Sequence, residues 1–72
     1  MQNTALGNYT EQIEKLPQVE SRTGKAKSAI YAGVKNGTFP APIKLGPRAV
    51  GWLKSEIDAW ISDRIRDSRK GR

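Results

Sequence analysis

Apolar residues near the start of the chain recur at helical spacing. Leu16-Pro17 is typical of a helix entry, because proline is tolerated in the first turn, where its missing N–H has no partner to lose. Val19 then falls on the inner face of a short helix. Gly24 provides a sharp exit, since glycine accepts positive φ without a steric penalty. The pattern therefore predicts a helix over residues 16–23.

A second helical pattern covers residues 26–36. Ala26, Ile30 and Val34 are spaced four residues apart and predict one buried stripe. An asparagine–glycine pair at the end of this segment is a strong helix stop. Two short helices joined by a glycine turn form a helix-turn-helix candidate, although many small helical hairpins share that pattern.

The middle of the chain changes from helical to extended spacing. Pro40 and Pro42 exclude helix just after Phe39, and Phe39 itself is expected to close the core under this turn. Residues 43–45 alternate apolar and polar, as a half-buried strand does, and residues 49–52 form a second strand candidate. A Gly-Pro turn joins them, so we predict a two-stranded hairpin with Arg48 near its tip.

A third helical pattern begins at Ser55. Ser55 and Asp58 are three residues apart and match a capping pair at the start of a helix. One apolar stripe follows, formed by Ile57, Trp60, Ile61 and Ile65. The same periodicity indicates that Trp60, like Trp52 in its strand, packs in the core rather than stacking on bases.

These patterns divide the chain into three parts. We expect a flexible N-terminal arm over residues 1–12, a folded domain over 13–66 and a basic flexible tail over 67–72. Tyr9 and Ile13 are candidates to pack back on the core. The order helix, turn, helix, hairpin, helix predicts an α+β, mostly α fold, namely a winged helix-turn-helix.

Composition removes several classes of function. The 72 residues suffice for one domain and include no cysteine and no histidine, which excludes disulfides and the usual zinc-finger ligand sets. We predict no metal and no cofactor. Ser28 and Tyr31 have no histidine to activate them, so an enzyme is disfavoured. No apolar run is long enough to span a membrane, and the absence of cysteine fits the cytoplasm.

Charge is concentrated in the middle of the chain. The net charge is +6, and the segment from Ser21 to Lys54 contains seven basic residues and no acidic one. Such a segment indicates a surface that faces nucleic-acid phosphate, while the alternative is a solvated basic face without a partner. The candidate DNA-binding residues are Arg22, Lys25, Lys27, Ser28, Tyr31, Lys35, Lys44 and Arg48.

Within this set the positions suggest different roles. The second helix of a helix-turn-helix enters the major groove with its N-terminal half, so Lys27 and Ser28 could read base edges or hold phosphates. Lys35 is expected to meet the backbone. Lys44 and Arg48 on the wing could follow the backbone or enter a minor groove, and Arg48 could instead stack on Trp52.

The residues from Leu16 to Arg64 resemble the AlpA family of small prophage regulators, most specifically in the block from Lys44 to Trp52, which reads Lys44-Leu45-Gly46, Pro47 and Arg48-Ala49-Val50-Gly51-Trp52. The resemblance implies an excisionase-like, MerR-related winged helix that binds DNA as a transcriptional regulator or as a recombination directionality factor. Where the family usually has Gly-Leu-Ser-Arg-Ser-Thr-Ile-Tyr, this chain has a run that begins at Gly24 and ends at Tyr31, with alanine at the polar cap position and Lys27 in place of arginine. A lysine keeps the charge but lacks the two-pronged fork of arginine.

The leading hypothesis is therefore a sequence-specific double-stranded DNA-binding protein of a prophage or genomic island. It would act as an excisionase, as a regulator of the integrase gene, or as both, with an integrase as partner and several copies binding cooperatively. The rival hypotheses are a protein-interaction module that docks on an acidic partner, and a protein that binds single-stranded or structured RNA.

Overall fold

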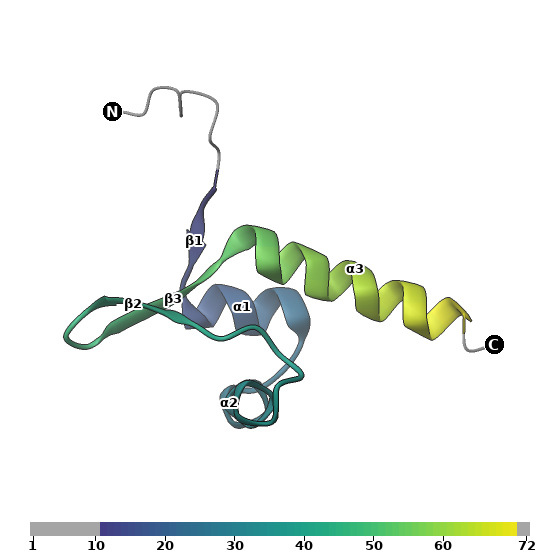
Figure 1. Cartoon of the computed structure of the whole chain (residues 1–72), viewed down its shortest axis with the longest axis horizontal. Helices are drawn as coiled ribbons and strands as arrows, with labels where there is room; N and C mark the ends of the chain where they lie inside the picture. The colour runs from purple at the N-terminus through teal and green to yellow at the C-terminus, as the bar shows by residue number, and fades with distance from the viewer. Residues whose placement is uncertain (1–10, 71–72) are drawn as a thin grey trace.

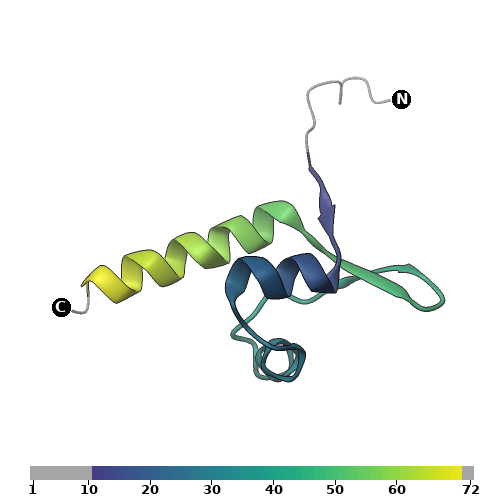
Figure 2. The same ribbon diagram turned by 180° about the vertical axis from the view of Figure 1, so that it is seen from behind.

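The computed structural model describes residues 11–70 of the chain. The elements in chain order are β1 (Ile13–Glu14), α1 (Leu16–Thr23), α2 (Lys27–Asn36), β2 (Ile43–Gly46), β3 (Ala49–Leu53) and α3 (Lys54–Lys70). The β2–β3 hairpin projects from one end of the molecule and α3 from the other, with α2 seen almost end-on below them (Figure 1). Figure 2 shows the same arrangement from behind. The predicted α+β, mostly α, winged helix-turn-helix fold is confirmed.

Helices α1 and α2 form the predicted pair. Gly24 ends α1 with φ of 73°, and its N–H donates to the carbonyl of Glu20 at 2.8 Å. A left-handed residue at this place is what turns the chain sharply into the second helix. Ala26 is the N-cap of α2 and has no side chain able to cap it, as the sequence suggested. Ala26 is exposed, however, so the predicted buried stripe begins only at Ile30.

The sheet has three antiparallel strands in the order β1-β3-β2, one more than predicted. The strand that was not predicted is β1, in which Ile13 pairs with Leu53 and Glu14 with Trp52 of β3. A two-residue strand is too short to show alternation, which explains why the sequence pattern missed it. Ile13 thus does pack on the domain, whereas Tyr9 lies outside the described residues. The predicted hairpin is confirmed, with a register shift between Lys44 and Gly46.

Strand β2 differs from the half-buried strand that its alternation predicted. Ile43 pairs with Gly51 on β3, so both lie on the face of the sheet opposite to Trp52. Among residues 11–70 no helix covers that outer face, and Ile43 and Leu45 are 37% and 42% exposed. Ile13 on the neighbouring edge strand is similarly exposed. Strand β2 therefore carries its apolar side chains on the side away from the core, whereas Val50 and Trp52 of β3 face the core.

The start of α3 differs from the prediction. The helix begins at Lys54, so Ser55 is already inside its first turn and is not the N-cap. Its cap comes instead from Glu11, whose carboxylate accepts hydrogen bonds from the backbone N–H and the hydroxyl of Ser55. The N–H of Lys54 donates to the carbonyl of Gln12 at 2.8 Å. Residues 11 and 12, assigned by sequence to the flexible arm, are therefore attached to the domain.

The end of α3 also extends beyond the prediction. The helix continues to Lys70, four residues past the predicted end of the domain at residue 66. Ion pairs three residues apart, Arg66 with Asp63 and Arg64 with Asp67, join successive turns there. Within residues 11–70 no helix combines the length and the apolar character needed to cross a membrane.

The core lies where the sheet meets the three helices. Its buried members are Val19, Ile30, Phe39, Trp52 and Ile57. Trp52 is fully buried, and its indole N–H donates to the carbonyl of Pro40 at 2.8 Å. Trp60 packs against this core, and its indole N–H donates to the carbonyl of Thr38. The predicted core roles of Phe39 and of both tryptophans are confirmed.

Candidate nucleic-acid interface

One side of α2 is covered by the predicted DNA-facing residues. Lys27, Tyr31 and Lys35 are spaced four residues apart and so lie on one face, with Ser28 beside them. The buried residues of the helix, Ile30 and Gly33, occupy the other side. Lys27, Ser28 and Lys35 are exposed, and Tyr31 is half-buried. The tyrosine ring meets Trp52 edge-on at 5.9 Å between centroids, so the ring seals the core beneath this face.

The strand register gives the direction of Lys44. Lys44 pairs with Val50, and Val50 is two residues from Trp52, so all three side chains lie on the same face of the sheet. Because Trp52 contacts Tyr31 of α2, this is the face of the sheet turned toward α2. Arg48 lies in the turn between the two strands, as predicted. The wing therefore directs a lysine toward the side that α2 occupies.

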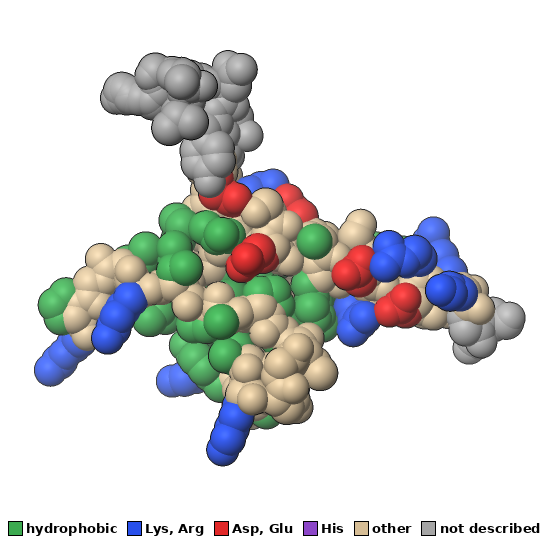
Figure 3. Space-filling view, in the orientation of Figure 1, with side chains coloured by type: hydrophobic (Ala, Val, Ile, Leu, Met, Phe, Trp, Pro, Cys, Tyr) green, Lys and Arg blue, Asp and Glu red, His purple; other side chains and the backbone are tan. Residues whose placement is uncertain are grey.

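Positive charge on these two elements is not neutralised inside the protein. Lys27 and Lys35 on α2 and Lys44 and Arg48 on the hairpin are exposed, and within residues 11–70 none of the four has an ion-pair partner. Figure 3 shows the basic side chains over α2 and over the hairpin projecting toward the lower left. The acidic side chains visible in that view lie above and to the right, near β1 and over α3.

Lys25 in the turn before α2 is held differently. Its ammonium group lies 5.7 Å from the centroid of the Trp60 ring, and the guanidinium group of Arg64 lies 5.4 Å from the same ring. A cation is attracted to the face of an aromatic ring. The Trp60 ring therefore holds Lys25, from the turn before α2, near Arg64 of α3. Arg64 is a basic residue near the turn that was not among the sequence candidates. Its position four residues after Trp60 on one helix was the signal that could have found it.

Arg22 is placed apart from this surface. One of its nitrogens pairs with Glu14 at 2.7 Å and another with Asp58, so the guanidinium joins β1, α1 and α3. The hydrogen bonds from Arg22 first and Lys54 second lower the pKa of Asp58. The hydrogen bond to Asp58 in turn raises the pKa of Arg22. Its role in DNA binding stays a prediction, while its contacts in the structure are those of an internal tie.

The first turn of α2 leaves polar groups available. Ala26 provides no side-chain hydrogen bond at the N-cap, and no acidic residue lies in the first turn. The N–H groups at the start of a helix have no partner within the helix and carry the positive end of its dipole. Together with the adjacent lysines, this end of α2 has the chemistry to accept an oxygen anion such as a phosphate.

The fold and this exposed basic face define a small winged helix-turn-helix protein. The family model of the prophage CP4-57 regulatory protein (AlpA) matches residues 12–65, so the chain belongs to the AlpA family of prophage regulatory proteins. It is similar to the DNA-binding transcriptional activator AlpA of Escherichia coli strain K12, with 38% identity over 60 residues, 75% of this chain and 86% of the relative. It is also similar to the protein ORF88 of Enterobacteria phage P4, with 36% identity over 61 residues, 85% of this chain and 69% of the relative. No solved structure matches the chain.

Proposed function

We propose that this chain is a sequence-specific double-stranded DNA-binding protein that regulates an integrated prophage or genomic island. In this proposal α2 enters the major groove, as the second helix of a helix-turn-helix does. Lys27 and Ser28, at its N-terminal end, meet base edges there. Lysine can reach O6 and N7 of guanine, and serine can pair with several base edges.

The observation that carries the proposal is the set of four exposed basic residues without ion-pair partners in the described structure, Lys27, Lys35, Lys44 and Arg48. They come from two elements that meet through Tyr31 and Trp52. A basic face that met only solvent would not need cations from two elements that contact each other. The acidic residues of the domain could also have neutralised these four cations. Leaving them unpaired favours an external polyanion.

The remaining contacts position the protein on the duplex. Lys25 and Lys35 would meet phosphates on either side of the major groove, and the uncapped start of α2 would meet another. Lys44 and Arg48 would follow the backbone beside the hairpin, with Arg48 able to enter an adjacent narrow minor groove. The uncovered apolar face of the hairpin lies on the other side of the sheet and takes no part in this contact.

For the biological role we propose an excisionase, a regulator of the integrase gene, or one protein with both roles. Membership of the AlpA family and the similarity to a DNA-binding transcriptional activator of E. coli support a regulatory role in transcription. An integrase is the proposed protein partner if excision is the role. Several copies would bind neighbouring sites cooperatively, because one small domain contacts few bases.

The test is a gel-shift and footprinting experiment on the attachment region and integrase promoter of the element that carries the gene. We expect a protected site and, with about five phosphate contacts, a slope of log affinity against log salt of about −4 to −5. Lys27→Ala should weaken binding to the protected site more than to a scrambled duplex. Arg69→Ala removes the same charge from the far end of α3 and serves as the matched control on a single-site duplex.

Absence of any protected site in those regions would contradict the proposal. Charge reversal at Lys27 and Arg48 separates it from the protein-interaction alternative. If both variants lose duplex binding and regulation together, DNA is the functional ligand. If regulation survives the loss of duplex binding, an acidic protein partner is the ligand instead.

A further inference from the structure

The second half of α3 extends beyond the core. Ile57 in the first turn is buried, and Trp60 and Ile61 pack against the core. Between Ser62 and Lys70 every residue is exposed except Asp63, and Ile65 is 48% exposed. Figure 1 shows this part of the helix projecting away from the other elements. The last turns of α3 therefore hold an apolar side chain in solvent without a covering element in the described structure.

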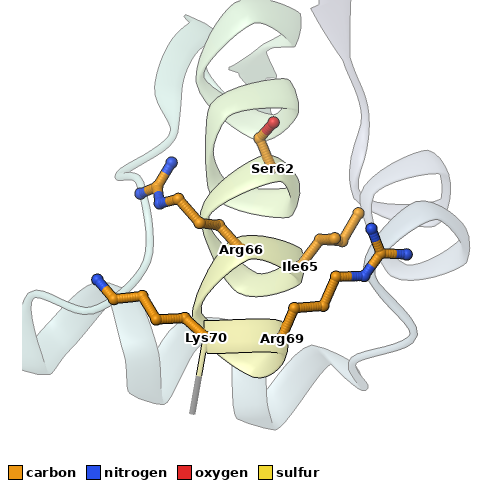
Figure 4. Close-up of a pocket in the computed structure, with 5 residues that line it drawn as sticks. All are labelled: Ser62, Ile65, Arg66, Arg69 and Lys70. Atoms are coloured by element: carbon orange, nitrogen blue, oxygen red, sulfur yellow. The ribbon is translucent and has the colours of Figure 1, made fainter. Parts of the chain in front are cut away.

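A shallow basic groove runs along this projecting part. It is lined by Ser62, Ile65, Arg66, Arg69 and Lys70. Figure 4 shows Arg66 and Lys70 on one side of the helix and Ile65 and Arg69 on the other. Arg66 is paired with Asp63, but within residues 11–70 neither Arg69 nor Lys70 has an ion-pair partner. The groove thus combines an exposed isoleucine with two unpaired cations.

A second groove of opposite charge lies on the first half of α3. It is lined by Pro40, Glu56, Ala59, Trp60 and Asp63. Its apolar part comes from the proline, the alanine and the indole, and its lining includes two carboxylates and no basic side chain. Glu56 has no ion-pair partner among the described residues. This groove therefore offers an apolar floor and an unpaired anion, which complement the basic groove.

The two grooves are neighbours on α3, and the ion pair between Arg66 and Asp63 joins their linings. Arg69 and Lys70 cannot reach Glu56 of the same molecule, because they lie about 20 Å farther along the helix at a rise of 1.5 Å per residue. Around the helix axis the two linings are centred about 100° apart, so the grooves face different directions although their edges touch. One copy can therefore present its basic groove to one neighbour and its acidic groove to another. Symmetric pairing through the basic groove would instead bring cations against cations, which is unfavourable.

We propose that a second copy of this chain docks here, with the end of α3 from one copy placed in the acidic groove of the next. Ile65 covers Ala59 and Trp60 of the neighbour, and Arg69 and Lys70 face its Glu56. The contact joins two different surfaces, so it repeats head to tail and forms an open row. This inference rests on the proposed function, because such a row would supply cooperative binding to adjacent sites on DNA, where the local concentration of copies is high.

The first experiment compares duplexes that carry one site and two adjacent sites. The wild-type chain is expected to bind the second site cooperatively. Glu56→Lys, and separately the double change Arg69→Glu with Lys70→Glu, should reduce the cooperativity by about ten-fold. The three changes combined in one chain should restore it, because opposite charges face each other again. Ser21→Glu on α1 is the control for an added charge elsewhere.

Two results would overturn the proposal. One is a wild-type chain without cooperativity, or with a cooperativity that neither reversal changes. The other is an equal loss of affinity on one-site and two-site duplexes when Arg69 and Lys70 are reversed, because the basic groove would then contact DNA rather than another copy.

A second experiment needs no DNA and so separates this inference from the proposed function. The chain has no cysteine, so single cysteines can be introduced cleanly. Ala59→Cys marks the acidic groove, and Ser68→Cys marks the end of α3 that carries the basic groove, nine residues farther along the helix. A mixture of the two variants, treated with a short bifunctional maleimide, should give mixed dimers in excess over dimers of either variant alone. Statistical yields, equal to those with Ser21→Cys as one component, would refute the head-to-tail contact.

Discussion

The carboxylate of Glu11 holds Ser55 at the start of α3 by two hydrogen bonds. The hydroxyl of Ser55 donates at 2.6 Å and its backbone N–H donates at 3.1 Å. These hydrogen bonds, that of the hydroxyl first, lower the pKa of Glu11. A negative charge at this place also faces the positive end of the α3 dipole. The segment before β1 is thereby attached to the helix that packs on the core.

Replacing Glu11 by glutamine is expected to lower the free energy of unfolding at neutral pH. A carboxylate whose pKa is depressed on folding stabilises the fold above its unfolded pKa of about 4.3. That contribution is lost as the pH falls through the lower folded value. Glu11→Gln and wild type should therefore differ most near neutrality and converge in acid. Urea titrations over a series of pH values measure this difference, and a gap that is constant with pH would contradict the assignment.

Arg22→Ala is expected to destabilise the protein by about 1–3 kcal/mol without weakening DNA binding of the folded variant. The side chain of Glu14 is only 8% exposed and already has one buried oxygen without a hydrogen-bond partner. Removing Arg22 leaves that carboxylate without its ion pair. Urea unfolding and duplex affinity, measured well below the midpoint of thermal unfolding, separate the two effects. An unchanged stability with a reduced affinity would restore Arg22 to the set of DNA contacts.

Gly33→Ala tests how closely α2 packs against Phe39, because that distance decides whether the substitution raises or lowers the free energy of unfolding. An alanine in the middle of a helix ordinarily stabilises it by about 1 kcal/mol relative to glycine. Here the added Cβ would lie 2.8 Å from the Cβ of Phe39, too close for the core to remain in place. We expect a net destabilisation of about 1–3 kcal/mol, from overpacking against the residue that closes the core. A stabilised variant in urea unfolding would show that the approach of Phe39 to α2 is looser than described.

Tyr31→Phe separates the two roles of this residue. The ring that meets Trp52 is retained, so the free energy of unfolding should change little. If the hydroxyl donates to a phosphate, duplex affinity should fall about five-fold, the equivalent of one hydrogen bond of about 1 kcal/mol. Tyr31→Ala is the comparison, because it should lose stability as well as affinity. Equal affinities of Tyr31→Phe and wild type would limit Tyr31 to core packing.

Much of the candidate site follows from local sequence. The face of α2 that carries Lys27 and Lys35 is set by helical periodicity, and the place of Arg48 is set by the turn between two short strands. What local sequence could not provide is the support beneath these residues. The attachment of Lys25 to Trp60 joins the helix-turn-helix to α3, and the direction of Lys44 depends on its register with Val50.

The sequence by itself determined the order of the three helices and the hairpin, although not strand β1, and the position of the basic segment. Those features arise from glycine and proline conformations and from apolar spacing, which act over a few residues. Only the tertiary structure decided which cations are neutralised. Arg22 and Lys27 look alike along the chain, but the partners of Arg22 are 8 and 36 residues away in sequence. Ion pairs over such separations depend on how the elements pack, and no local pattern encodes that packing.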